Sequence, residues 1–390
     1  MTRLTQAIIN LTRLTSLSTR VLADVAGGTA FVQRPPSFTV PAFVNLGIAG
    51  SGYFGGGSDG VRISGIDKIT FSSETRTTLS ATLTSARQSL AGMANSGTAG
   101  YFGGGSDSVG NLSGIDKITF LADTKTTLSA TLTSARTTLA GMANSGVAGY
   151  FGGGANGPLI SGIDKITFPA DTKTTLSATL TSTNGGMAGM ANSGVAGYFA
   201  GGYGGSNTNR IDKITFPADT KTTLSAVLTN SPDGCSGMAN SGVAGYVGGG
   251  YSGGYTSVID KITFPADTKT TLSAVLSSGR NDFGGMANSG VAGYFGGGNT
   301  TVNISGIGKI TFPADSKTTL TPTLTAGTAR MAAFANSSVA GYFSGGITTV
   351  NIDTTDKITF PADTKTTISA QLTSARRLLA GMAHSGVAGY

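Results

Sequence analysis

The sequence is poor in the residues from which most active sites are built. It has one cysteine, Cys235, one histidine, His384, and no tryptophan. A single cysteine excludes an intramolecular disulfide. A single histidine, near the C-terminus, argues against a nucleophile–histidine–carboxylate set and against zinc or copper sites built from histidine and cysteine. The aspartates are isolated rather than gathered in a calcium loop. We therefore expect no enzyme activity, no metal site and no cofactor.

Charge and long apolar runs are also scarce. Only 12 % of the residues are charged, and the formal net charge of +7 is diffuse, because the aspartates and lysines of each repeat nearly cancel. We therefore expect no nucleic-acid binding. No run of about 18 apolar residues occurs, which argues against membrane insertion. The first 20 residues do not read as a secretory signal, although their arginine-rich, acid-poor composition is also typical of an organelle transit peptide.

Glycine, by contrast, is abundant, with 61 residues, and much of it lies in one recurring stretch, AGYFGGG. The glycine runs do not match a phosphate-binding loop, because no helix pattern and no Lys-Ser/Thr pair follows them. The Gly-Tyr core of the stretch recurs at a spacing of 48 residues, with one interval of 49. Its tyrosines are Tyr53, Tyr101, Tyr150, Tyr198, Tyr246, Tyr294, Tyr342 and Tyr390. A fixed period of this length is typical of repeat architectures.

One repeat shows the plan of the unit. The apolar segment 139–143, the Asn-Ser-Gly turn, the segment 147–152 and the β-branched segment 163–168 predict three strands. A Pro-Ala-Asp-Thr-Lys turn follows, and the alternation over 174–180 predicts a fourth, outer strand. Four strands joined by tight hairpins form an antiparallel meander, which is one propeller blade. The competing fold, a β-solenoid, would have shorter coils without paired hairpins.

These units resemble the kelch motif from Val44 to the C-terminus. The resemblance rests on Tyr150 with Gly152 and Gly153, on the strand and Asp turn of 163–171, and on the Ser-Ala-Arg segment 134–136. The tryptophan of kelch units is replaced by leucines (Leu79, Leu128 and Leu176), and the histidine that often follows the arginine is missing. The resemblance implies an all-β, kelch-like β-propeller.

Seven intervals between the tyrosines predict seven blades. The eighth copy, from Ala383 to Tyr390, is incomplete, and we expect it to pair with strands near 44–57 so that the ring closes. The alternative is a strand left over from an aborted further repeat. Ile163, Ile166, Phe168 and Leu176 should supply the core between blades, while the small residues of 140–143 allow the inner strands to approach closely. We expect the adjacent Asp and Lys of each third strand to make ion pairs, with each Asp reaching a lysine on the next blade.

Residues 1–44 lie outside the repeat, which gives two domains, an arm at 1–44 and a propeller at 45–390. Apolar residues fall on one helical face of the arm in a weak amphipathic pattern. These residues are Leu4, Ile8, Leu11, Leu22 and Val25. We interpret the segment as a docking or oligomerisation arm; a terminus without a partner is the alternative.

Comparison of the units locates the candidate binding face. The Asn-Ser-Gly and Pro-Ala-Asp-Thr-Lys turns hardly vary, whereas the connection after each second strand and the connection between blades do. In an up-and-down blade these two variable sets emerge on the same face, and variable loops on a rigid scaffold are how binding surfaces are usually built. The candidate residues are Tyr203, Asn207, Arg210, Tyr251, Tyr255, Arg280, Asp282 and Phe283. The alternative is drift in loops that are free of packing constraints.

Together these features predict a non-enzymatic structural or recognition protein. Near-identical glycine- and threonine-rich units after a short arm resemble virion proteins of tailed phages, such as tail fibres, capsid fibres and decoration proteins. That resemblance implies other virion proteins as partners of the arm, a host-surface protein or glycan as partner of the loop face, and location in the phage particle. The alternative is a cellular, cytoplasmic kelch-type adaptor or a glycan-binding lectin.

Overall fold

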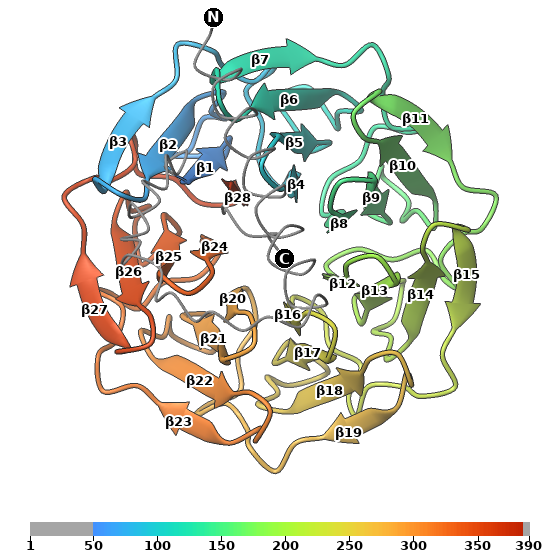
Figure 1. The fold of residues 1–390 in the computed structure, drawn as a ribbon, viewed down its shortest axis with the longest axis vertical. Helices are drawn as coiled ribbons and strands as arrows, with labels where there is room; N and C mark the ends of the chain where they lie inside the picture. Colours follow the sequence, from blue (N-terminus) through green and yellow to red (C-terminus); the bar gives the residue numbers. More distant parts are fainter. Residues whose placement is uncertain (1–49, 385–390) are drawn as a thin grey trace, which may run out of the picture. The chain divides into compact units, whose positions relative to one another are not determined.

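Residues 50–384, the part of the chain described by this computed structural model, form seven four-stranded antiparallel sheets arranged as blades around one axis (Figure 1). The all-β, seven-bladed propeller predicted from the repeat is confirmed. Blade 1 combines β28 with β1, β2 and β3, and blades 2 to 7 follow in chain order from β4 to β27. The proposed docking arm and the boundary between residues 44 and 45 lie outside the described residues, as does the end of the eighth copy, residues 385–390.

The innermost strands are β28 (Ala380–His384), β4 (Ala91–Asn95), β8 (Ala140–Asn144), β12 (Ala188–Asn192), β16 (Ser236–Asn240), β20 (Gly284–Asn288) and β24 (Ala332–Asn336). The second strands are β1 (Ser51–Gly55), β5 (Ala99–Gly103), β9 (Ala148–Gly152), β13 (Ala196–Ala200), β17 (Ala244–Gly248), β21 (Ala292–Gly296) and β25 (Ala340–Ser344). The third strands are β2 (Ile66–Thr70), β6 (Ile115–Thr119), β10 (Ile163–Thr167), β14 (Ile211–Thr215), β18 (Ile259–Thr263), β22 (Ile307–Thr311) and β26 (Thr355–Thr359). The outer strands are β3 (Thr75–Thr78), β7 (Thr124–Thr127), β11 (Thr172–Thr175), β15 (Thr220–Thr223), β19 (Lys269–Thr271), β23 (Lys317–Thr319) and β27 (Thr364–Thr367).

The outer strand differs from the sequence prediction. It covers Thr172–Thr175 rather than 174–180, because the chain leaves the sheet at Leu176 to cross to the next blade. Leu176 and Leu180 are both buried on this crossing, 7 % and 4 % exposed, where they pack in the core between blades. The alternation that suggested a longer strand is therefore the pattern of a buried connection.

A C-terminal strand closes the ring near the predicted partner, but this strand is Ala380–His384 and holds only the first two residues of the eighth copy. β28 pairs antiparallel with β1, with Ala380 opposite Gly55 and His384 opposite Ser51. Blade 1 therefore takes its innermost strand from the end of the chain and its other three from the beginning. This arrangement leaves neither end of the repeat array with an unpaired edge, the usual weakness of open sheets.

A ring of backbone hydrogen bonds also runs through the seven connections between blades. Each N–H in the ring donates to the carbonyl oxygen of the corresponding residue one blade earlier, as in Thr138 to Ser89 at 3.1 Å and Arg330 to Asp282 at 2.8 Å. The members are Ser89, Thr138, Gly186, Gly234, Asp282, Arg330 and Leu378, all at positive φ. Because these residues lie just before the innermost strands, the ring joins every blade to both its neighbours.

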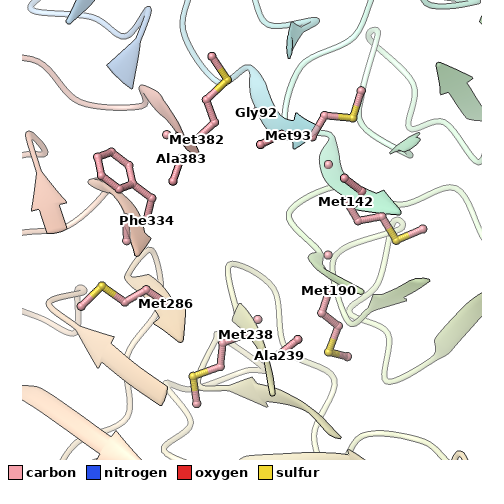
Figure 2. A pocket seen from close by; sticks show the side chains of 18 of the residues that line it. Gly92, Met93, Met142, Met190, Met238, Ala239, Met286, Phe334, Met382 and Ala383 are labelled. Atoms are coloured by element: carbon pink, nitrogen blue, oxygen red, sulfur yellow. The ribbon is translucent and has the colours of Figure 1, made fainter. Parts of the chain in front are cut away.

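Methionines of the innermost strands pack against glycines in the second strands of the next blade. The Sδ atom of Met93 in blade 2 would lie 2.2 Å from a Cβ placed on Gly149 in blade 3, so only glycine allows this approach. Figure 2 shows these side chains around the axis: five further methionines and Phe334 repeat the position of Met93. Thus the first glycine of AGYFGGG is required by close packing. The last two of the blade 3 copy, Gly153 and Gly154, have φ of 61° and 102° and start the turn into the loop.

The core between blades consists of the residues that the sequence predicted. Ile163 and Ile166 are fully buried, and Phe168 is 5 % exposed. The Phe168 ring stacks on Tyr101 of the preceding blade, with ring centroids 5.0 Å apart. Burial of each such side chain is worth roughly 1.5–3 kcal/mol, and the ring repeats this contribution at every blade junction.

Polar contacts between blades follow two recurring patterns, and the sequence prediction had one of them reversed. The third-strand lysine, not the aspartate, reaches the next blade: Lys117 Nζ lies 2.6 Å from Asp171 Oδ2, and Tyr101 Oη donates to Asp171 Oδ1 at 2.7 Å. Burial, and then the hydrogen bond to Asp171, raises the pKa of Tyr101 above its ordinary range. The lysine carries the contact because its longer stem can reach across the junction.

The third-strand aspartate turns toward the connection that precedes its own blade. Asp164 accepts hydrogen bonds from the N–H and hydroxyl of Thr133, at 2.9 and 2.6 Å, and from Thr175 Oγ1 at 2.8 Å. The guanidinium of Arg136, which is fully buried, forms an ion pair with the same carboxylate. Lys173 Nζ adds a second cation–anion contact at 3.3 Å. These contacts fix the connection against the blade.

Candidate binding face

The two sets of variable loops lie on the same face of the propeller, as predicted. Isolated β-bridges join each connection between blades to the loop after the second strand, for example Gly185 to Tyr203, and a further bridge from Tyr203 to Asn207 closes the loop itself. The Tyr203 N–H donates to the Gly185 carbonyl at 2.9 Å, and the reciprocal bond is 3.0 Å. Each pair of loops is therefore one ordered unit whose geometry the blade sets. We call this surface the loop face.

The predicted tyrosines are exposed on the loop face. Tyr203 is 44 % exposed, Tyr251 42 % and Tyr255 39 %. The rings of Tyr251 and Tyr255 meet edge to face at 5.3 Å. Asn207 Nδ2 donates to the Tyr251 carbonyl at 2.5 Å, and Tyr255 Oη donates to Asn299 Oδ1 at 3.2 Å. The loops of blades 4, 5 and 6 are thus joined into a continuous aromatic and amide surface.

Arg210 is exposed, as predicted, but it lies at the far end of its loop. It directly precedes β14, and its carbonyl accepts the Gly201 N–H at 3.1 Å. The structure therefore places Arg210 in the same loop as Tyr203 and Asn207, at the end that leads into the third strand.

Two of the predicted residues are buried and do not belong to the loop face. Arg280 is fully buried, and its Nη1 donates to the Gly306 carbonyl at 3.0 Å. Phe283 is 8 % exposed and packs edge to face on Phe295, 5.5 Å between centroids. Both prediction errors have one cause: the connection between blades enters the core, so only part of its variation is on the surface.

Asp282 is partly exposed, but it does not lie beside the tyrosines of the loop face. Its Oδ2 lies 3.1 Å from Nε of Arg330, and both side chains are partly exposed. Since its backbone belongs to the hydrogen-bonded ring around the axis, the pair lies near the axis rather than beside the tyrosines. The structure therefore does not bring Asp282 together with Tyr203 or Tyr255.

Sequence reasoning missed a set of exposed valines at the loop tips. Val109 is 94 % exposed and Val61 is 75 % exposed, and each sits between polar or glycine residues of its loop. Val302 and Val350, both 67 % exposed, hold the matching place in blades 6 and 7. Blades 4 and 5 lack this valine and carry the tyrosines. The available signal was the place of each valine as the fourth residue of its loop, which an alignment of the units would have shown.

Two carboxyl groups on the loop face have shifted pKa values. Hydrogen bonds from the N–H groups of Gly110 and Val109 lower the pKa of Asp107. Burial raises the pKa of Asp233; the Gly234 N–H opposes this effect, and the charge of Asp282 adds to it. The loop face thus combines acidic groups with exposed apolar side chains at the loop tips.

No protein-family model and no curated protein matches this sequence. One solved structure with a similar fold is entitled "Structure of YjhT". It aligns with a TM-score of 0.56 and 14 % identity, over 72 % of this chain and 97 % of that chain. At this identity the likeness shows the propeller fold alone.

The opposite face of the propeller is uniform. Its Asn-Ser-Gly turns are braced by side chains of the preceding blade, as where Asn144 Oδ1 accepts the Gly194 N–H at 2.8 Å. Valines follow these turns at similar exposures, 41 % for Val195, 40 % for Val243 and 42 % for Val291. Variation in sequence and in side-chain chemistry is therefore concentrated on the loop face.

The axis of the propeller holds a cavity of about 210 Å³. It is lined by the Gly-Met-Ala segments of the inner strands and by Ala333, Phe334 and Ala335 in blade 7 (Figure 2). Its described lining offers backbone groups and apolar side chains. Such a lining can accept an apolar group but supplies no acid, base or nucleophile of its own.

Residues 50–384 hold no cluster of three or more histidine, cysteine or acidic side chains that could bind a metal. Burial raises the pKa of Cys235 to about 12, so the thiolate needed for reactivity is scarce at neutral pH. Within the same residues, no helix meets the length and hydropathy of a membrane span.

Proposed function

We propose that this protein is a non-enzymatic structural and recognition protein whose loop face binds a ligand. The observation that carries the proposal is the contrast between the two faces: one repeats the same braced turns, and the other presents exposed Tyr203, Tyr251 and Tyr255 on ordered loops. Tyrosine supplies a large amphipathic contact area at a low cost in conformational entropy, and asparagine adds adaptable hydrogen bonds. A rigid propeller also holds these loops before binding, which reduces the entropy lost on association.

We further propose that residues 1–44 attach the propeller to a phage particle, as part of a tail fibre, capsid fibre or decoration protein. Support comes from the resemblance of the near-identical repeats and short leading arm to such proteins. The apolar residues Leu4, Ile8 and Leu11 are the proposed contacts with the particle. The ligand of the loop face would then be a protein or glycan of the host surface.

The attachment is tested by sedimentation of native particles through a density gradient. We expect the full chain to sediment with capsid or tail subunits. The triple variant Leu4→Ser, Ile8→Ser and Leu11→Ser should fold normally by circular dichroism but remain at the top of the gradient. Sedimentation of this variant with the particles, as for the wild type, would contradict a docking role for the arm.

A cellular adaptor or lectin is the second candidate, and the loop face favours it equally, because exposed tyrosines beside amides suit protein and glycan ligands alike. The same gradient separates the two functions. Capsid or tail subunits associated with the native chain support the virion protein, whereas cellular proteins alone support the adaptor or lectin.

A further inference from the structure

Blade 6 carries a buried cation whose counter-ion has been lost from the chain. In blade 3 the buried Arg136 pairs with Asp164, and the same pairs occur as Arg87 with Asp116 and Arg376 with Asp67. Arg280 is the corresponding arginine of blade 6, but Gly308 stands where the aspartate would be. The site is therefore an arginine–aspartate site without its carboxylate.

The guanidinium of Arg280 nevertheless keeps the position of its counterparts. Its Nη1 donates to the Gly306 carbonyl at 3.0 Å and its Nη2 to the Phe295 carbonyl at 3.3 Å. Arg136 makes the same two bonds, at 2.9 Å to Gly162 and 3.4 Å to Phe151. Neutral carbonyl oxygens thus hold Arg280 in place without neutralising its charge.

The space of the missing side chain remains open. A Cβ placed on Gly308 would meet nothing closer than Nη2 of Arg280 and Cδ2 of Leu276, both at 3.8 Å, which is ordinary van der Waals contact. Neighbouring side chains have therefore not moved in to fill the position of the Cβ. The opening lies beside a fully buried guanidinium that points into it.

The other groups that surround the aspartate elsewhere are retained. Thr133, Lys173 and Thr175, which contact Asp164 in blade 3, correspond to Ser277, Lys317 and Thr319 in blade 6. Ser277 and Thr319 are exposed, so the position can be reached from solvent. Hydroxyl, N–H, ammonium and guanidinium donors are all present, and only the acceptor is missing.

Three other blades depart from the arginine–aspartate pattern in the opposite way, because they lack the arginine and not the aspartate. Blades 4, 5 and 7 lack the arginine but keep the aspartate, which pairs with the outer-strand lysine at 3.1 Å in the case of Asp212 and Lys221. Within residues 50–384, blade 6 is the one blade in which both cations are present and the carboxylate is not. An uncompensated buried charge is costly, and burial accordingly lowers the pKa of Arg280 to about 10.

Phe283 offers a partial compensation. Its ring lies under the guanidinium of Arg280, with Cζ 5.4 Å from the centroid, where the blades that keep both the arginine and the aspartate have leucine. A cation–π contact is attractive but supplies no acceptor for the guanidinium N–H groups that face Gly308. The ring therefore leaves the requirement for an anion in place.

We propose that this opening is a binding site for a small monocarboxylate of the size of acetate or formate. Acetate has the shape of an aspartate side chain beyond Cα, so its two oxygens can take the positions of Oδ1 and Oδ2. The bound anion replaces the missing carboxylate and accepts from Arg280, Ser277 and Thr319. A charge-assisted contact with a guanidinium is the strongest part of this donor set.

The test measures thermal unfolding of the full chain while acetate replaces gluconate at constant ionic strength. Gluconate is too large for the site. At a tenfold excess over its dissociation constant, acetate should raise the wild-type Tm by about 2 °C. Formate should raise the Tm by a similar amount. Chloride is a sphere with one charge centre and should raise the Tm less. The Gly308→Asp variant carries its own carboxylate and should be at least as stable in gluconate as the wild type is in acetate, with no further response to acetate.

A second variant transfers the site to another blade. Asp164→Gly leaves Arg136 facing an equivalent opening in blade 3, and its loss of stability should be partly restored by acetate. Broadening of the methyl ¹³C resonance of acetate, which needs only folded protein, should occur with the wild type and disappear with Gly308→Asp. Equal responses to acetate in the wild type and Gly308→Asp, or no response in the wild type, would overturn the proposal.

Discussion

The backbone N–H of Ser89 donates to the carbonyl oxygen of Leu378 at 2.9 Å, joining the two ends of the repeat array. Next to this bond, β28 completes blade 1 by pairing with β1. The C-terminal residues therefore close the propeller in two ways. They supply a strand of blade 1, and they supply one hydrogen bond of the ring around the axis. A closed ring is what holds the variable loops in fixed positions relative to one another.

Loss of β28 should open the ring. A chain that ends at Leu379 lacks the inner strand of blade 1 and exposes the edge of β1, so we expect aggregation and a loss of cooperative unfolding. A chain that ends at His384 keeps every described contact of β28 and serves as the control. Size-exclusion chromatography and calorimetry make the comparison, and a soluble, cooperatively unfolding chain ending at Leu379 would refute closure by this strand.

The junction of blades 7 and 1 should be stabilised by Glu74→Asp. In the other six junctions a tyrosine hydroxyl donates to an aspartate of the next blade, as in Tyr101 with Asp171, but Glu74 stands at this place in blade 1. Tyr342 Oη is consequently buried without a partner among the described residues. The shorter carboxylate should accept from Tyr342 and add about 1 kcal/mol to the free energy of unfolding.

The reverse change provides the control for this junction. Asp171→Glu should cost a similar amount, because the longer side chain would leave Tyr101 unpartnered. Urea denaturation measures both variants. Equal stability of all three proteins would show that the choice of carboxylate does not govern the junction.

Ala200 and Val247 should behave as a compensating pair. In blade 3 the corresponding position is Gly152, whose Cβ would lie 2.5 Å from Cζ of Phe199 in the next blade. Blade 4 has Ala200, and the facing residue of blade 5 is the smaller Val247, which shares its core cluster. Val247→Phe alone should lose about 1–3 kcal/mol by overpacking. Addition of Ala200→Gly should restore most of this loss in a double-mutant cycle, and additive losses would contradict the pairing.

Acid should weaken the propeller through its buried aspartates. Burial acts to raise the pKa of Asp164, but the hydrogen bonds of Thr133 and the charge of Arg136 outweigh it, and the pKa is lowered. The folded state therefore binds fewer protons than the unfolded chain, whose aspartates titrate near pH 3.9. The stabilisation is present above about pH 4 and is lost as the pH falls through the lowered pKa.

The variant Asp164→Asn isolates this effect. It should lose about 3–5 kcal/mol at pH 7, because Arg136 is left buried without its counter-ion. Between pH 4 and pH 2 it should then lose less further stability than the wild type. Asp59→Asn, which changes an exposed carboxylate, is the control. An identical acid dependence of Asp164→Asn and the wild type would rule out the assigned role.

The sequence predicted the architecture because the repeat displays it seven times. The spacing of the tyrosines sets the number of blades, and β-branched segments such as 163–168 mark the strands that fill the core. The sequence could not show whether a polar side chain is directed toward solvent or into the core. Arg136 and Arg280 lie in polar connections of the kind expected for surface loops, yet both guanidiniums are fully buried.

The candidate site was predictable only in part for the same reason. Tyr203, Tyr251 and Tyr255 were found because they interrupt a repeated pattern with a chemistry suited to binding. Val109 was missed because valine is usually a core or strand residue, and only the surrounding loop geometry exposes it. Connections that combine buried and exposed positions have no simple periodicity from which the two could be separated.

The loop face as a binding surface is tested most directly by probing glycan arrays and bacterial envelope fractions with the fluorescently labelled full chain. The triple variant Tyr203→Ala, Tyr251→Ala and Tyr255→Ala removes the aromatic surface. The matched control Val195→Ala, Val243→Ala and Val291→Ala changes side chains of similar exposure on the opposite face. We predict binding by the wild type and the valine variant and its loss in the tyrosine variant. Undiminished binding by the tyrosine variant, or no binding by the wild type, would contradict the account.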